Sequence, residues 1–191
     1  MIFANKSNLS THLRLISLDP RSLVVMTKWY NHFVTFPFLL YTTYMIIIAH
    51  NIRSLHNIGS IFRNAAAFGV EKLYLTGFTA VPPRKEIAKV ALGAQDLVAW
   101  EQGSIGLVIS SLKDQGYQVI GLETGKDAKD IASIKKSKIA LVLGNEVEGI
   151  DPETLKMLDA IVEIPMDKKR SLNVSVASGV AMYVLGKEGR S

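Results

Sequence analysis

The sequence contains no cysteine, and it contains only four histidines in 191 residues. Without thiols, the protein forms no disulfide, holds no Cys-ligated zinc or iron–sulfur cluster, and uses no thiolate nucleophile. So few histidines also make a His-rich metal site unexpected; they are His12, His32, His50 and His56. We therefore expect chemistry that requires no metal.

Glycine and glutamate are missing from residues 1–44, and all fourteen glycines follow that segment. The segment carries eight of the fifteen aromatic residues and a net charge of +3, which leaves a net charge of only +2 to residues 45–191. The overall basicity is thus weak support for nucleic-acid binding by the main domain. We expect two parts: an N-terminal extension at 1–44 and a main domain at 45–191. Two interpretations of the extension stay open, a poorly packed, disordered segment or a translation start upstream of a working start at Met45.

Residues 33–49 carry no charged side chain, which is at the lower edge of the length needed to span a membrane. Pro37 and three threonines interrupt this run, and its end at residues 45–49 is better explained as a buried strand. No signal-peptide pattern accompanies it. We expect no membrane association and a cytoplasmic protein.

From Met45 onward, apolar runs alternate with helical periods. Strands are predicted at 46–49, 72–76, 117–122, 139–143 and 160–164. Helices are predicted at 58–68 (capped by Asn57 and ended by Gly69), 84–92, 104–115, 127–134, from Asp151-Pro152 onward, and at 172–185 with Ser171 or Asn173 as the cap. This alternation predicts an α/β fold with a parallel sheet covered by helices on both faces.

Arg63 stands out in the first polar segment, residues 51–63, which runs from a strand into a helix start. It lies about 140° around the helix from the apolar stripe, so it points to solvent, a partner or a site. From position alone, a plain surface arginine is the favoured interpretation, and local sequence favours helix capping over substrate contact for Asn57.

Two further polar segments follow strands and could hold a ligand at the carboxyl edge of the sheet. In the first, Gly144, Asn145, Glu146 and Glu148 lie in a glycine-flanked loop. In the second, a basic loop at 167–170 leads into a helix rich in small residues, which allow close backbone approach; they are Ser175, Ala177, Ser178, Gly179 and Ala181. Solvated loops and tight core packing are the alternative explanations.

The segments NIRSLHNIGSIFRNAAAFGV, LVLGNEVEGI and IPMDKKRSLNVSVASG resemble, in this order, the three motifs of the SpoU/TrmH family within the SPOUT class. KVALGAQDLVAWE also resembles the family. The resemblance extends from Met45 to about Gly186. It implies a methyltransferase that uses S-adenosylmethionine to modify a ribose 2′-OH of tRNA or rRNA.

The resemblance also implies a parallel sheet with a C-terminal trefoil knot, a homodimer, and a cofactor held in the knot. The implied cofactor contacts are Gly144, Ile164 and Leu172, with Asn145 nearby. The implied catalytic residues are Arg63, Asn57, Glu146, Ser171 and Asn173, with Arg63 orienting RNA and the ribose hydroxyl.

One departure from the family pattern lies at residues 167–170, where four residues without glycine replace the usual five that include one. A different loop shape over the cofactor is therefore expected. Two other functions remain as alternatives: a SPOUT-type base-nitrogen RNA methyltransferase, and a non-catalytic RNA-binding or assembly module that retains the knot. A nucleotide-binding α/β domain that prefers NAD or ATP is the simplest alternative.

Overall fold

A computed structural model describes residues 44–135, 138–168 and 171–186. Except for Tyr44, the proposed extension lies outside the described residues, and so do Lys169 and Arg170 of the basic loop. The described chain contains a seven-stranded sheet in which all neighbouring strands are parallel. The predicted parallel sheet is thereby confirmed.

The strands do not lie in chain order. Their spatial order is β3-β2-β1-β6-β4-β7-β5, so β6 separates β1 from β4, and β7 separates β4 from β5. The strands are β1 (Tyr44–His50), β2 (Lys72–Thr76), β3 (Ala99–Gly103), β4 (Gln118–Leu122), β5 (Lys129–Asp130), β6 (Lys138–Leu143) and β7 (Ala160–Glu163). The α-helices are α3 (Leu55–Phe68), α4 (Lys85–Ala91), α5 (Ile105–Asp114), α6 (Pro152–Lys156) and α7 (Val174–Gly186). The described residues also form two 3₁₀ turns, η2 (Ala94–Asp96) and η3 (Ile131–Ser133).

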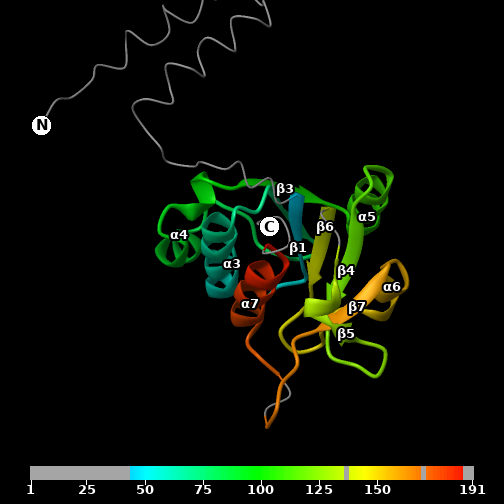
Figure 1. The fold of residues 1–191 in the computed structure, drawn as a ribbon. Helices are drawn as coiled ribbons and strands as arrows, with labels where there is room; N and C mark the ends of the chain where they lie inside the picture. Colours follow the sequence, from blue (N-terminus) through cyan, green and yellow to red (C-terminus); the bar gives the residue numbers. More distant parts are fainter. Residues whose placement is uncertain (1–43, 136–137, 169–170, 187–191) are drawn as a thin grey trace, which may run out of the picture. The chain divides into compact units, whose positions relative to one another are not determined.

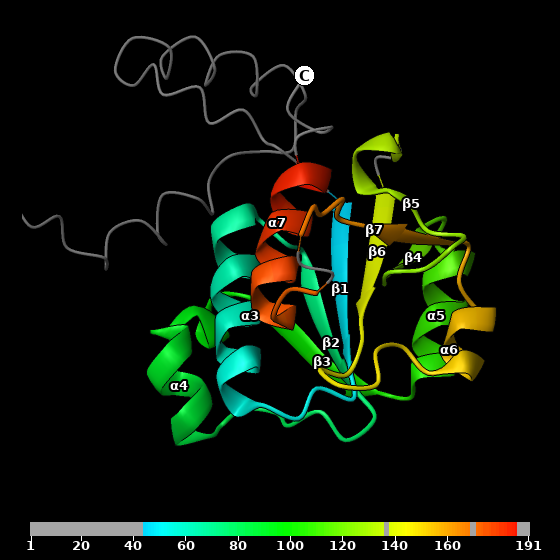
Figure 2. The ribbon, with the colours of Figure 1, turned by 90° about the horizontal axis from the view of Figure 1, so that it is seen from below.

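The sheet has a hydrophobic core on each face because successive strand side chains point to opposite sides. In β1, Ile47 and Ala49 belong to one core, whereas Ile46 and Ile48 belong to the other. Helices α3, α4 and α7 cover the first face, and α5 and α6 cover the second (Figures 1 and 2). Both faces are thus covered, as the alternating sequence pattern predicted.

Helix α3 begins one turn earlier than predicted. Its N-cap is Ser54, whose hydroxyl accepts a hydrogen bond from the Asn57 backbone N–H at 3.3 Å. The prediction that Asn57 caps this helix is therefore wrong, because Asn57 lies inside the first turn with its side chain engaged elsewhere. The predicted end is confirmed, since Gly69 adopts φ 70° there.

Helix α7 packs closely against α3. Asn173 precedes the helix, and its Oδ1 accepts a hydrogen bond from the Ser175 N–H at 2.9 Å, so it caps the helix as one of the two predicted alternatives. Asn64 of α3 donates to the Ser175 carbonyl at 2.8 Å and the Ser178 hydroxyl at 3.1 Å. A β-carbon at Gly179 would lie 3.1 Å from the same amide, so the small residues serve this contact.

Two elements differ from the predictions. Strand β3 was not predicted, because its residues AWEQG are mostly exposed at the sheet edge and show no apolar alternation. The helix predicted at 127–134 is wrong: Lys129 and Asp130 pair with β7, and the Asp130 carboxylate then accepts the Ala132 N–H at 2.8 Å to start η3.

The uncharged run at 33–49 ends in the centre of the sheet. Residues 45–49 belong to β1, a strand that pairs with both β2 and β6. Within the described parts of the chain, no helix is both long enough and apolar enough to span a membrane.

Candidate functional site

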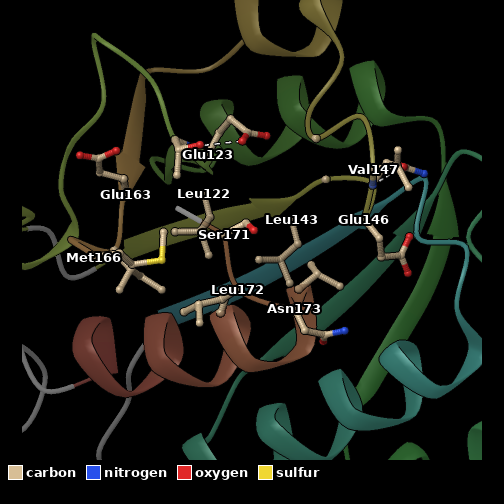
Figure 3. Close-up of a pocket in the computed structure, with 17 residues that line it drawn as sticks. Leu122, Glu123, Leu143, Glu146, Val147, Glu163, Met166, Ser171, Leu172 and Asn173 are labelled. Atoms are coloured by element: carbon tan, nitrogen blue, oxygen red, sulfur yellow. Dashed lines mark hydrogen bonds between the residues drawn. The ribbon is translucent and has the colours of Figure 1, made fainter. Parts of the chain in front are cut away.

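A cavity of about 280 Å³ lies where the carboxyl ends of β4, β6 and β7 meet the start of α7 (Figure 3). It brings together seven of the nine site residues predicted from the sequence: Gly144, Asn145, Glu146, Ile164, Ser171, Leu172 and Asn173. Segments far apart in the chain therefore converge at one edge of the sheet, which is the usual ligand position in such folds.

The loop after β6 is closed on itself. Asn145 and Gly149 exchange two backbone hydrogen bonds, of 2.9 and 3.0 Å. The Asn145 side chain accepts from the N–H groups of Val147 and Glu148 and donates to the Asn51 carbonyl at 2.8 Å. Asn145 therefore fixes the loop shape and ties it to the end of β1.

The Glu146 carboxylate binds the start of α3. It accepts hydrogen bonds from the backbone N–H groups of Arg53 and Ser54, both at 2.9 Å, and from the Asn57 amide at 2.8 Å. Figure 3 shows this side chain directed away from the centre of the cavity. The Asn57 and Glu146 side chains are thus in direct contact, although Asn57 does not line the cavity.

Hydrogen bonding holds Glu146 in its charged form. Burial raises the pKa of this carboxyl, but the hydrogen bonds from Arg53, Ser54 and Asn57 outweigh burial and leave the pKa below its ordinary value of 4.5. A carboxylate with a low pKa and three donors is a poor proton acceptor. The geometry therefore favours a positioning role for Glu146 over a general-base role.

The start of α7 supplies the opposite wall of the cavity. Leu172 is 42% exposed there, so an apolar side chain faces open space. Apart from bonds within the sheet, the backbone N–H and C=O groups of Ile164 and Leu172 form no hydrogen bond with any described residue. This wall thus offers apolar surface together with free peptide groups.

Several residues that line the cavity were not predicted from the sequence, and Glu123 is the most informative of them. Its carboxylate accepts the N–H groups of Ile150 at 3.0 Å and Thr124 at 3.1 Å, so it supports the loop after β6. Its position directly after a predicted strand was a usable signal, because acids at carboxyl ends of parallel strands gather at the ligand edge. Glu163, the last residue of β7, and Met166, which follows this strand, also line the cavity.

Arg63 does not line this cavity. Its side chain is exposed on α3, and its guanidinium forms no hydrogen bond or ion pair with any described residue. The interpretation that Arg63 points away from the core is confirmed. Within one chain, however, the structure does not place it with the other predicted catalytic residues.

A second polar network lies at the end of β1. Buried His50 contacts the Thr76 hydroxyl through Nδ1 at 2.8 Å and Asp151 through Nε2 at 3.1 Å. Burial lowers the His50 pKa and outweighs the effect of Asp151, which raises it. Burial raises the Asp151 pKa, but hydrogen bonds from Thr154 together with His50 leave it below its ordinary value of 3.8. The network joins β1 and β2 to the start of α6.

These pKa shifts predict acid sensitivity. A histidine with a lowered pKa takes up its proton in the unfolded chain first, so the free energy of unfolding should begin to fall as the pH drops below about 6.5. Glu146 and Asp151 should add a second loss below their ordinary values of 4.5 and 3.8, because their stabilisation is present above those values. Urea unfolding across this pH range would measure both steps.

His50→Gln is the matched variant for the first step. It should reduce the fall in the free energy of unfolding just below pH 6.5 and keep the loss due to Glu146, whose hydrogen-bond donors it leaves in place. A wild-type free energy of unfolding that rises as the pH falls through 6.5 would contradict the lowered pKa of His50.

Known proteins match the part of the chain that contains the cavity. A model of the SpoU rRNA Methylase family matches residues 44–183. The 23S rRNA (guanosine-2'-O-)-methyltransferase RlmB of Vibrio parahaemolyticus is 31% identical over 144 residues, 74% of this chain and 58% of that protein. The tRNA (guanosine(18)-2'-O)-methyltransferase of Aquifex aeolicus is 31% identical over 143 residues, 73% of this chain and 67% of that protein. The chain thus matches only part of the length of these relatives.

A solved structure has the same fold. The crystal structure of an AdoMet-bound rRNA methyltransferase from Sinorhizobium meliloti matches with a TM-score of 0.70 and 24% identity, over 75% of this chain and 56% of that one. The family model covers nearly all of the described residues and includes every residue of the cavity. The chain belongs to the SpoU rRNA methylase family.

Proposed function

We propose that this protein transfers a methyl group from S-adenosylmethionine (AdoMet) to a ribose 2′-OH of tRNA or rRNA. The observation that carries the proposal is the cavity at the ends of β4, β6 and β7, which gathers seven of the nine predicted site residues. The two curated relatives are named for guanosine 2′-O-methylation of 23S rRNA and of tRNA. Both RNA classes therefore remain candidate substrates.

The cavity suits AdoMet chemically. Apolar side chains from β4, β6 and α7 can contact an adenine ring, and the free peptide groups of Ile164 and Leu172 can hydrogen-bond its edges. Glu163 at the rim can balance a cationic ligand. We assign Gly144, Asn145, Ile164 and Leu172 to cofactor binding. When bound there, AdoMet supplies an electrophilic methyl group.

The chain's own residues would position the acceptor. Glu146 and Asn57 fix the start of α3, while Ser171 and Asn173 form the opposite wall. Orientation of this kind lowers barriers by about 7–11 kcal/mol in favourable systems. The proposed role of Arg63 is to bind RNA phosphate through its guanidinium and to orient the hydroxyl.

A homodimer would complete the site. Arg63 lies outside its own cavity, and α7 exposes apolar side chains along one side, with Val176 51% exposed, Val180 36% and Tyr183 45%. Such a stripe is typical of a surface that a partner covers. We therefore propose that Arg63 of one copy serves the cavity of the other.

The C-terminal part is proposed to be knotted, with residues 45–191 as the methyltransferase domain. In support, the chain leaves β7 between β4 and β5, then packs α7 against α3 on the opposite half of the sheet. Such connections are exceptions to ordinary chain topology. A crystal structure in which residues 164–186 pass outside the 122–138 loop would contradict the knot.

Arg63→Ala is expected to lower kcat at least about 100-fold without affecting folding, because it removes a cation that acts on the acceptor. Asn173→Ala should lower kcat to a similar extent, because Asn173 lines the cavity of its own chain. Mixed dimers of the two variants hold one intact site, so remixing should restore about one quarter of wild-type activity. The measurement is transfer from labelled AdoMet to unmodified tRNA and rRNA, followed by nucleoside analysis.

The outcomes separate the candidate functions. A 2′-O-methylnucleoside formed by wild type and lost in Arg63→Ala supports the proposal. A base-methylated product would favour the base-nitrogen enzyme. AdoMet binding without transfer to either RNA would favour the non-catalytic module. Transfer by Arg63→Ala at the wild-type rate would contradict the role of the arginine.

A further inference from the structure

Phe78 is a large aromatic side chain that is 61% exposed, although the loop that carries it is held firmly. Its backbone N–H donates to the Asn51 Oδ1 at 3.2 Å. The next residue, Thr79, is only 3% exposed and bonds through its hydroxyl to the Ala49 carbonyl and the Ile52 N–H, both at 3.0 Å. Phe78 is thus presented to solvent by an ordered backbone.

Gly77 allows this presentation. It has φ 65°, and a β-carbon there would collide with the Asn51 side chain. The loop therefore lies directly on Asn51, and the direction of Phe78 is set by packing as well as hydrogen bonds. An exposed aromatic ring on a rigid loop costs hydration free energy unless it meets a partner.

Phe78 lies close to the proposed active site. Asn51, which holds the Phe78 N–H, also accepts a hydrogen bond from Asn145, a residue of the cavity. Two residues further, Arg53 donates its N–H to Glu146, and its exposed guanidinium forms no hydrogen bond with the described part of the chain. One loop therefore presents an aromatic ring and its neighbour presents a cation, and hydrogen bonds join the two loops to the cavity residues Asn145 and Glu146.

We propose that Phe78 stacks on a base flanking the nucleotide to be methylated, while Arg53 binds an adjacent phosphate. This inference rests on the proposed function and extends it to the form of the substrate. Bases inside a duplex are already stacked, so only an unpaired RNA segment can offer a base face to Phe78. The preferred substrate is therefore an RNA loop or single-stranded region. Phe78 acts as a substrate-positioning residue.

The test compares the full-length wild type with Phe78→Ala and Phe78→Tyr, and uses Leu107→Ala as the matched control. Leu107 is 75% exposed on α5, which covers the face of the sheet opposite α3 and α7. The probes are unmodified tRNA, a hairpin with an unpaired loop, and a fully paired duplex of equal length. Filter binding gives the Kd for each, and equilibrium dialysis gives the AdoMet affinity.

Phe78→Ala is expected to weaken binding to tRNA and the hairpin about 5- to 150-fold, as loss of one stacked base does. Phe78→Tyr should retain binding, Leu107→Ala should match wild type, and AdoMet affinity should not change. In turnover, KM should rise while kcat stays near wild type. Arg53→Ala should reduce the slope of log K against log salt by about one.

Unchanged hairpin binding by Phe78→Ala would overturn the inference, and so would an equal loss for hairpin and duplex. A change in oligomeric state with unchanged RNA affinity would instead assign Phe78 to a contact between copies. Phe78-dependent binding without methyl transfer would contradict the proposed function and leave the stacking role intact. Methyl transfer by Phe78→Ala at the wild-type rate and with unchanged KM would contradict the stacking role and leave the proposed function intact.

Discussion

Replacing Glu146 by alanine is expected to reduce kcat/KM at least about 100-fold, because displacements of about 1 Å near the reacting groups have effects of that size. The substitution removes the acceptor for the Arg53 and Ser54 N–H groups and the Asn57 amide together. We also expect the free energy of unfolding to fall by about 2–4 kcal/mol, since hydrogen bonds to a charged acceptor contribute about 1.5–3 kcal/mol each and are not additive.

Two variants separate the causes of this effect. Glu148→Ala removes an exposed carboxylate from the same loop and should behave as wild type, because that side chain bonds no described residue. Glu146→Gln keeps the shape but turns an amide donor toward a backbone N–H, so it should lose a large part of the activity. Methyl-transfer rates with urea unfolding measure both quantities. Full activity of Glu146→Ala would show that the α3 start needs no such support.

Gly144→Ala is expected to disrupt the loop after β6 and abolish AdoMet binding. A β-carbon there would lie 2.4 Å from the Gly149 carbonyl carbon and 2.5 Å from the Ile150 nitrogen. These are backbone atoms held by the Asn145–Gly149 hydrogen bonds, so they have no easy way to move. Overpacking of this kind costs about 1–3 kcal/mol.

Gly125→Ala is the control for that substitution. A β-carbon at Gly125 meets nothing within 4 Å, so this variant should keep its stability within about 0.5 kcal/mol of wild type. Calorimetric titration with AdoMet and thermal unfolding would compare the two. Equal AdoMet affinity in both variants would exclude a role for the close Gly144–Gly149 approach.

Local sequence patterns were enough to predict most of the sheet. The predicted strand at 72–76 has the bounds of β2, and the 139–143 run lies within β6, because continuous apolar runs suit a sheet buried on both faces. The Asp151-Pro152 helix start is confirmed by the Thr154 N–H bond to Asp151 at 2.9 Å. These features depend on neighbours within a few residues.

The features that were not predicted depend on contacts between residues far apart in the sequence. Asn57 was predicted as a cap because asparagine is favoured there, but its side chain binds Glu146, 89 residues away. The exposed position of Arg63 followed from helical periodicity, whereas its absence from the cavity did not. Glu123 could have been placed at the ligand edge from its position after a predicted strand, but its contact with the loop after β6 depends on the strand order, which was not predicted.

The position of β6 has a consequence for biosynthesis. Strands β1 and β4 both leave the ribosome before β6, yet each pairs with β6 in the centre of the sheet. In a nascent chain that ends before residue 138, β1 lacks its neighbour β6 and β4 lacks both β6 and β7. Open strand edges of this kind are templates for aggregation. Chaperone demand during translation should therefore be greatest before β6 emerges.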